Sequence, residues 1–341
     1  MEQEINGFAH MKDSLQEACE EDSWLQKLSF YLEHQLIDIS IEALSVLSYL
    51  LGGDEVQGKF VGALVEKNID LTVVAALNRF DERLERDRFG VSCALEIVES
   101  IANVSFLKRR LFDAVKKWLI ERVQLDLADA QSNKCAATDL LALFCQSADC
   151  ELEREEFDLL FKLIFSADAS TQKDEDDESF CNGLTDALCA SLLNSPKNLE
   201  YFVSEPFLLS SCIQQMRTGK RSSKENALKI IDYALNGGNS STLERLALNF
   251  VAQNGPKTLF PLLMKSKICS ELESLCISVA YSLICNLNSS EAAEARQRVI
   301  SKFAENDFEK KNKLIDSLQA DNKEEDSFFI KEALLKVLEE Q

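Results

Sequence analysis

Carboxylates on matching helix positions are the clearest chemical feature of this sequence. Glu96 and Glu99 lie one helical turn apart, and Asp139 occupies the equivalent place in the next segment of similar pattern. Residues three or four apart share one face of a helix, and an acidic face can attract lysine and arginine side chains of another protein. An ordinary solvated face carries the same pattern, so both interpretations stay open.

Catalytic constellations are missing from the sequence. The two histidines, His10 and His34, have no serine or cysteine partner at a recognisable spacing. No glycine-rich phosphate loop, zinc-binding H-E-x-x-H or nucleophile-elbow motif occurs. The 11 cysteines are odd in number and lack C-x-x-C spacing, so we interpret them as small buried hydrophobes. The sequence predicts that the protein is not an enzyme and has no cofactor or metal site.

Helices must position the acidic residues, because the composition disfavours other folds. The 341 residues include only 11 Gly and 4 Pro, too few for the many turns of an all-β protein. The hydrophobic fraction of 46% is ample for a buried core.

Small residues open apolar helices at seven regular places, 43 to 53 residues apart. These openers are Ala43, Ala94, Ala137, Gly183, Ala227, Ala280 and Ala333. The spacing is close to the roughly 40–47 residues of armadillo and HEAT repeats, which bury their apolar faces by stacking on their neighbours. We predict an all-α, armadillo-type right-handed superhelical solenoid of stacked three-helix repeats.

Helix-terminating and helix-capping residues between the apolar segments support this prediction. Gly52-Gly53 and Gly237-Gly238 follow opener helices, where glycine can provide a left-handed exit. Asp70 and Asn239 are expected to cap helices that come next in the chain.

Candidate partner-binding residues follow from the repeat phase. In armadillo proteins the third helix of each repeat lines a groove, and residues two and six positions beyond an opener project into it. With the adjacent Glu99 added, the candidates are Tyr49, Glu96, Glu99, Ser100, Asp139, Lys229, Tyr233 and Asn286. The same count selects Thr185 and Cys189. Whether these residues bind a ligand or merely coat the groove stays open.

Charge limits the class of partner. The net charge is −21, and residues 149–178 carry 12 acids against three basic residues. Such a field repels phosphate and disfavours direct binding to nucleic acid or anionic membranes, whereas basic peptides are attracted. The acidity can equally serve solubility, with residues 167–178 as a disordered loop within one repeat.

Domain organisation follows from the same patterns. We expect an acidic segment over residues 1–22, for which disorder is one option, and an armadillo-like repeat domain over residues 23–341, with the acidic loop at about 167–178. No apolar run approaches the ~18 residues of a membrane span. The beginning of the chain does not resemble a signal peptide, so we expect an intracellular protein.

Longer strings resemble one known family. They are GVSCALEIVESIAN (90–103), SSKENALKIIDYALNG (222–237), TLFPLLMKS (258–266) and KFAENDFEK (302–310). These strings are similar to segments of the beta-catenin-like protein 1 family and occur in the family's order, so that the resemblance spans roughly residues 35–335.

The resemblance implies a nuclear armadillo protein associated with the spliceosome. The expected function is then a scaffold for pre-mRNA splicing that binds basic segments of splicing-complex subunits, particularly of the nineteen complex. The alternative is a nuclear-transport adaptor or a cytoplasmic armadillo scaffold. Import receptors of the importin-alpha type repeat Trp and Asn along the groove, and only Asn286 matches that array here.

The chain departs from the family in its length. Family members are longer, carry a basic nuclear-import signal before the repeats and continue through further helices. This sequence begins with an acidic segment without a Lys/Arg cluster. It therefore reads as a divergent short member or an incomplete gene model, with a nuclear location expected from the family and no import signal of its own.

Overall fold

A computed structural model describes residues 22–52, 58–127, 130–166, 175–305, 309–320 and 326–339. All regular structure in these ranges is helical, which confirms the all-α class. The chain divides into two compact units, Met1–Cys150 and Glu151–Gln341. Residues 1–21 of the expected acidic segment and residues 167–174 of the expected acidic loop lie outside the described ranges.

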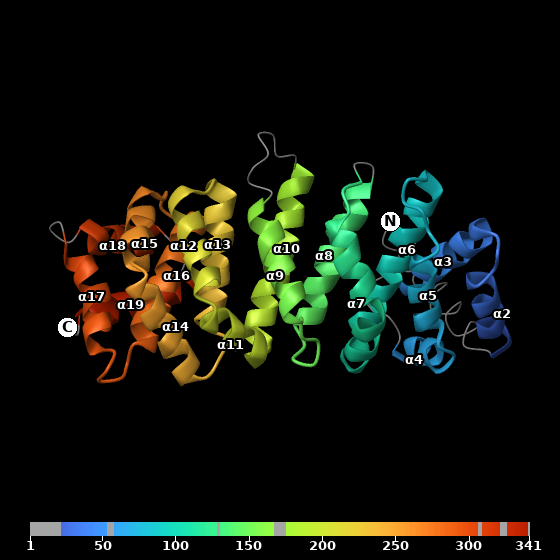
Figure 1. Ribbon diagram of the computed structural model, residues 1–341, viewed down its shortest axis with the longest axis horizontal. Coiled ribbons are helices and arrows are strands. Elements are labelled where there is room, and N and C mark those ends of the chain that lie inside the picture. Colours follow the sequence, from blue (N-terminus) through green and yellow to red (C-terminus); the bar gives the residue numbers. More distant parts are fainter. Residues whose placement is uncertain are drawn as a thin grey trace, which may run out of the picture. The chain divides into compact units, whose positions relative to one another are not determined.

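In each unit consecutive helices are joined by short connecting segments (Figure 1). The first unit contains α2 (Asp22–Leu32), α3 (Ile37–Leu51), α4 (Gly58–Glu66), α5 (Ile69–Leu77), α6 (Glu85–Ala102), the 3₁₀ turn η1 (Ser105–Leu107), α7 (Lys108–Gln124) and α8 (Gln131–Cys145). The second contains α9 (Arg154–Ser166), α10 (Glu175–Asn194), α11 (Pro196–Ser204), α12 (Pro206–Thr218), α13 (Arg221–Ala234), α14 (Ser240–Ala252), α15 (Gly255–Lys265), α16 (Glu271–Asn286), α17 (Ala293–Ala304), α18 (Glu309–Ala320) and α19 (Asp326–Glu339).

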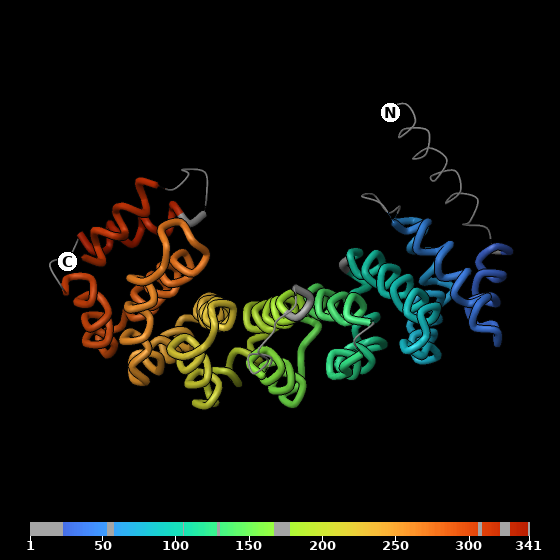
Figure 2. Tube along the Cα trace, turned by 90° about the horizontal axis from the view of Figure 1, so that it is seen from above, coloured from blue at the N-terminus to red at the C-terminus, as the bar shows by residue number. Residues whose placement is uncertain are grey.

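The opener helices form the spine of each unit. In the first unit α3 packs on α6 and α6 on α8. In the second, α10 packs on α13, α13 on α16 and α16 on α19, so that these helices lie beside one another in chain order (Figure 2). Ala94, Ala137, Ala227 and Ala280 are fully buried, because a methyl side chain lets two helices approach closely. These four openers therefore mark stacking contacts, as the sequence predicted, whereas Ala43 and Ala333 are only half-buried.

Two repeats are shorter than the three-helix pattern. Three helices make up α4–α6, α11–α13, α14–α16 and α17–α19, whereas a single described helix separates α6 from α8 and α8 from α10. Before α8 this helix is the long α7, preceded by the 3₁₀ turn η1.

Local caps were predicted with mixed success. The side chain of Asn239 accepts a hydrogen bond from the Thr242 amide at 3.0 Å and caps α14 as expected. The expected left-handed exit is wrong at Gly52, whose φ is −67°. Left-handed backbone occurs instead at Asn68 and Asn254, immediately before α5 and α15. Asparagine tolerates this conformation better than most residues, so it makes the tight junction between two consecutive helices.

Gly237 serves close packing rather than a left-handed turn. A Cβ atom at this position would lie 2.3 Å from the carbonyl oxygen of Leu192 at the end of α10. The loop after α13 therefore runs directly against the backbone of α10, and only glycine fits there.

Ion pairs with buried carboxylates tie α7 to other segments of the first unit. Asp70, expected as a cap, is the second residue of α5, and its carboxylate pairs with the Arg110 guanidinium of α7 at 2.8 Å. Burial raises the pKa of Asp70, although the Arg110 charge opposes that rise. Arg122 and Glu82 form a second pair, in which both side chains are almost completely buried, and Asn133 of α8 donates to Glu82 at 3.0 Å.

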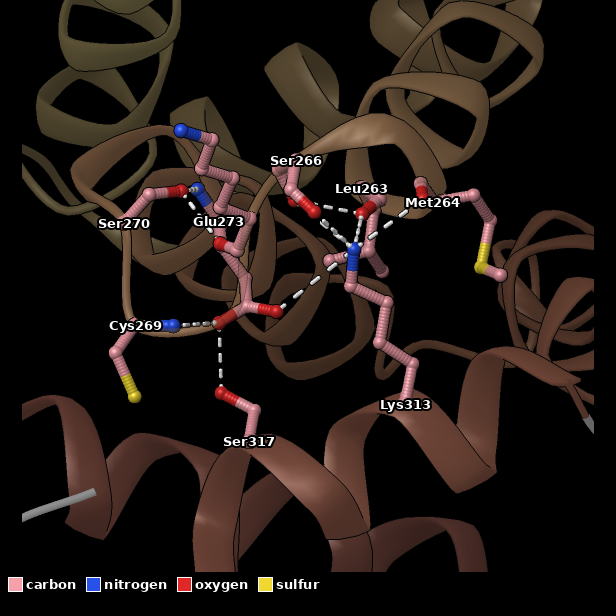
Figure 3. A network of polar contacts seen from close by, with 9 residues as sticks. Leu263, Met264, Ser266, Cys269, Ser270, Glu273, Lys313 and Ser317 are labelled. Atoms are coloured by element: carbon pink, nitrogen blue, oxygen red, sulfur yellow. Dashed lines mark hydrogen bonds and ion pairs between the residues drawn. The ribbon is translucent and has the colours of Figure 1, made fainter. Parts of the chain in front are cut away.

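A comparable network fastens the last repeats of the second unit (Figure 3). The Lys313 ammonium of α18 donates to the carbonyl oxygens of Met264 and Ser266 at the end of α15. Glu273 of α16 accepts from the Ser317 hydroxyl at 2.7 Å and from the Cys269 amide at 2.8 Å. Burial lowers the pKa of Lys313, while the nearby Glu273 opposes that change.

Several polar contacts between neighbouring repeats span similar sequence separations. The Ser48 hydroxyl bonds to Glu96, 48 residues away, and the Ser278 hydroxyl bonds to Asp232, 46 residues away. Ser317 and Glu273 are 44 residues apart. Each of these bonds therefore joins one repeat to the next.

Candidate functional site

The first unit presents an acidic stripe along the outward side of its opener helices. We call this set of exposed residues on α3, α6 and α8 the N-terminal stripe: Tyr49, Phe89, Glu96, Glu99 and Asp139. On α6 the spacing 89, 96 and 99 keeps one face outward, because 3.6 residues complete a turn. Three of the predicted candidates are thus exposed carboxylates on helices that pack against one another.

Hydrogen bonds orient the central acid. The carboxylate of Glu96 accepts from the hydroxyl of Ser48 on the neighbouring helix and from Ser92 at 3.4 Å on its own helix. Ser100, another predicted candidate, donates to the backbone carbonyl of Glu96 at 2.9 Å. Two serine hydroxyls satisfy only part of the acceptor capacity of a carboxylate, so Glu96 can accept from an incoming ammonium or guanidinium as well.

One arginine limits the length of this stripe. Arg86, at the start of α6, pairs with Asp38 at 2.7 Å and with Glu42 at 3.0 Å, both on α3. These two acids are therefore neutralised within the protein, and the acidic character is concentrated around Glu96, Glu99 and Asp139.

Exposed aromatic rings accompany the acids. Tyr49 is 59% exposed and Phe89 is 53% exposed. The sequence prediction included Tyr49 and missed Phe89, which lies one residue before Gly90 and seven before Glu96. The outward face of α6 could have revealed it, because the 3.6-residue period extends backwards from Glu96 and Glu99 as well as forwards. Aromatic faces attract the cationic heads of lysine and arginine.

The second unit carries a different set on its opener helices. We call these residues of α10, α13 and α16 the C-terminal stripe: Asp186, Lys229, Asp232, Tyr233 and Glu271. The Lys229 ammonium pairs with the Glu271 carboxylate at 2.9 Å, and the Lys229 side chain is 27% exposed. Burial is the largest single influence on the pKa of Lys229 and tends to lower it, but the bond to Glu271 together with the charges of Glu271 and Asp186 outweighs burial, so the pKa is raised. A cation of the protein itself thus occupies this acidic patch.

Burial also perturbs the carboxyls around Lys229. The pKa of Asp186 is raised by burial, although the Lys229 charge acts against the rise. The pKa of Asp232 is raised to about 6 by burial, with the hydroxyl of Ser278 donating to its Oδ1 atom at 2.8 Å. Burial is also the main cause that raises the pKa of Tyr233. Of these groups Asp232 is half-buried, whereas Asp186 and Tyr233 remain exposed.

Several predicted positions have other roles. Thr185 and Cys189 are buried, so the predicted phase of α10 is wrong by one residue and Asp186 faces outward instead. Asn286 donates from its amide to the Leu235 carbonyl at 2.8 Å and joins the ends of α16 and α13. Tyr233 remains 40% exposed, as expected for a surface residue.

Neither a metal site nor a membrane span is found in the part of the chain that the structure describes. No group of three or more His, Cys, Asp or Glu side chains there is arranged to hold a metal ion. No helix within the described ranges combines the length and the hydrophobicity needed to cross a bilayer.

Known proteins share both the sequence and the fold. The model of the family described as "Catenin-beta-like, Arm-motif containing nuclear" matches residues 3–331. Beta-catenin-like protein 1 of Mus musculus is 28% identical over 336 residues, covering 92% of this chain and 57% of the mouse protein. The beta-catenin-like protein 1 homolog of Schizosaccharomyces pombe is 27% identical over 303 residues, covering 85% of this chain and 52% of the yeast protein. The chain thus spans just over half the length of these relatives.

Solved structures agree on the architecture. A designed armadillo repeat protein in complex with the peptide (KR)4 superimposes with a TM-score of 0.54 at 14% identity, covering 76% of this chain and 99% of that chain. This likeness confirms the predicted armadillo fold, and such a fold serves as a protein-interaction scaffold. Together with the family match over nearly the whole length, it leads to one conclusion. The chain belongs to the catenin-beta-like family of armadillo-motif nuclear proteins.

Proposed function

We propose that this protein is a non-enzymatic scaffold of a pre-mRNA splicing assembly and that its N-terminal stripe binds lysine- and arginine-rich segments of splicing-complex proteins. The observation that carries the proposal is the joint exposure of Glu96, Glu99 and Asp139 beside the rings of Tyr49 and Phe89. The name of the family includes the word nuclear, and we propose a nuclear location for this chain as well.

The chemistry of the stripe supports a basic ligand. Carboxylates can pair with lysine or arginine heads, while exposed rings contact the apolar stems and the cations. The designed armadillo protein of similar fold was solved with a peptide of alternating lysine and arginine, which supports the same class of ligand for this chain.

Long-range attraction should dominate the encounter. The net charge of −21 and the exposure of the acids favour rapid association with a cationic segment. Exposed charges are screened within about 10 Å at 0.1 M salt, so the affinity should decrease steeply as salt increases.

Charge reversal tests the proposal. The probe is an eight-residue peptide of alternating lysine and arginine, and stopped-flow fluorescence measures its association with the whole chain. The variant Glu96→Lys, Glu99→Lys, Asp139→Lys should slow association about 30-fold at low salt. A matched triple variant, Glu66→Lys, Glu155→Lys, Glu291→Lys, makes the same change in net charge at exposed sites away from the stripe and should have a much smaller effect.

A second variant tests the rival attractor. The six acids among residues 168–178 are replaced by Asn or Gln, which removes that local charge without touching the stripe. If this variant loses binding while the stripe reversal keeps it, the acidic segment carries the contact and the proposed role of the stripe is wrong.

A further inference from the structure

An aromatic cavity lies between α9, α11 and α12, away from the opener helices. Its volume is about 560 Å³, within the range of sites that enclose small ligands or anchoring side chains. Its apolar lining comes from Phe161, Phe165, Tyr201, Phe207 and Leu208. Phe207 is 70% exposed, although phenylalanine is normally among the more buried residue types.

A break in helix packing creates this cavity. In the second unit α12 packs on α15 and α15 on α18, whereas α9 and α12 make at most a marginal contact within the described residues. The equivalent layer of helices is therefore incomplete at this level. Phe161 and Phe165 of α9 face the resulting space, with ring centroids 5.0 Å apart in an edge-to-face arrangement.

The wall of the cavity is held in place before any partner arrives. The Tyr201 hydroxyl lies 2.8 Å from both oxygens of the Asp158 carboxylate. The Tyr201 ring packs edge-to-face on Phe157 and lies 5.2 Å beneath the Arg154 guanidinium. Burial and the bond to Asp158 raise the pKa of Tyr201 to about 12, so the hydroxyl stays protonated as a donor at neutral pH.

Charge at the rim favours a cationic partner. Asp158 and Glu205 line the cavity against one cation, Lys162. A single hydroxyl proton of Tyr201 satisfies one acceptor site of Asp158, and a carboxylate offers about four. In the sequence, residues 149–178 carry 12 acids and three basic residues.

The chain's own neighbouring segment does not suit the cavity. Residues 167–174 read ADASTQKD and contain no apolar side chain larger than alanine. The occupant must therefore supply large apolar groups from elsewhere.

We propose that this cavity is a docking site for an amphipathic helix of a partner protein. That helix carries two large apolar anchors one turn apart, flanked by lysine or arginine. The spacing follows from the walls: Phe161 and Phe165 on α9, and Phe207 and Ser211 on α12, each lie one turn apart along their helices. Side chains so spaced match anchors at i and i+4 of a guest helix. This site is independent of the N-terminal stripe and does not rest on the proposed function.

A model peptide tests the site. The probe is a fluorescein-labelled helical peptide with leucine and phenylalanine on one face and lysine on the other, and anisotropy measures its binding to the whole chain. Phe207→Ala should weaken binding about tenfold, as loss of an aromatic anchor contact commonly does. Phe106→Ala removes a phenylalanine that is 77% exposed in the first unit and should change binding less than twofold.

Two altered peptides distinguish the contribution of the apolar anchors from that of the positive charges. A peptide with serine in place of its apolar anchors should bind the wild type and Phe207→Ala equally, and only the charge reversal of the N-terminal stripe should weaken it. A peptide with glutamate in place of lysine should bind at least tenfold more weakly than the lysine peptide, because like charges at the rim repel it.

Location and self-association complete the test. Hydrogen exchange should become slower in α9 and α12 when the lysine peptide is bound. The proposal is overturned if Phe207→Ala binds the peptide like the wild type, if no binding occurs, or if protection appears only in α3, α6 and α8. It is also overturned if sedimentation finds a wild-type dimer that Phe207→Ala converts to monomer, because a second copy would then be the occupant.

Discussion

The opener helices of the two units pack in the same way but differ in how their acidic side chains are paired. In the N-terminal stripe the acids Glu96, Glu99 and Asp139 are exposed, and the Glu96 carboxylate accepts hydrogen bonds from the hydroxyls of Ser48 and Ser92. In the C-terminal stripe Lys229 lies against Glu271. The comparison teaches that the opener helices of both units carry acids, while in the second unit a lysine of the protein itself pairs with one of them.

The largest effect on the free energy of unfolding is expected when the charge of Lys229 is reversed. Lys229→Glu should lower the free energy of unfolding by about 2 kcal/mol, because it breaks a half-buried ion pair and brings like charge beside Asp186 and Glu271. Glu99→Lys in the N-terminal stripe should change it by about 0.5 kcal/mol or less, as exposed sites usually do. Urea denaturation followed by circular dichroism measures both variants. Equal losses would mean that the two stripes do not differ in burial.

A buried carboxyl should make the C-terminal stripe sensitive to pH. The pKa of Asp232 is about 6 in the folded protein against an ordinary 3.8. Since the raised pKa favours the protonated form, its contribution to stability is full below about pH 3.8 and is lost as the pH rises through 6. Asp232→Asn should therefore raise the free energy of unfolding by about 1–2 kcal/mol at pH 7.5.

That gain should shrink as the pH falls from 6 to 4, and thermal unfolding over this range measures it. Glu99→Gln is the matched control on the exposed stripe, and it should leave the pH dependence unchanged. A constant difference between Asp232→Asn and the wild type at every pH would assign the effect to packing instead of titration.

Removing the internal cation should open the second patch. In the background of the charge-reversed N-terminal stripe, Lys229→Ala should raise the affinity for the lysine–arginine peptide about fivefold at low salt, because Asp186 and Glu271 lose their internal partner. Isothermal titration measures the affinity. Unchanged binding would show that these acids are too recessed to reach a ligand.

The smallest effect concerns the aromatic part of the N-terminal stripe. Phe89→Ala should weaken binding of the same peptide about threefold, the size expected for an exposed cation–π contact. Phe106→Ala, at another exposed ring of the same unit, is the control. Similar changes for both variants would remove Phe89 from the binding surface.

Local sequence signals predicted the framework of the fold well. The buried openers Ala94, Ala137, Ala227 and Ala280 follow from spacing and size alone, and Asn239 follows from its capping chemistry. Asp70 illustrates the limit: its sequence position suggests a cap, but an arginine 40 residues away uses its carboxylate. A partner that distant leaves no local pattern.

The candidate site was predictable only in part, because local spacing places a residue on a helix but does not show which neighbouring helix covers it. Counting from an opener correctly placed Glu96 and Asp139 on the surface, but the same count failed on α10, where Thr185 and Cys189 are buried. Helix phase depends on which side the next helix covers. The pairing of Lys229 with Glu271 was hidden in the sequence, because the two residues come from different helices.

Polar bonds between consecutive repeats have a consequence for folding during synthesis. The bonds that join Ser48 to Glu96, Asp232 to Ser278 and Glu273 to Ser317 span 48, 46 and 44 residues. Each repeat can therefore find its polar partners as soon as the next one leaves the ribosome, since domains form as units during synthesis and short-range contacts close quickly. Such a chain can assemble step by step behind the ribosome, with the growing end as the only repeat that still awaits its neighbour.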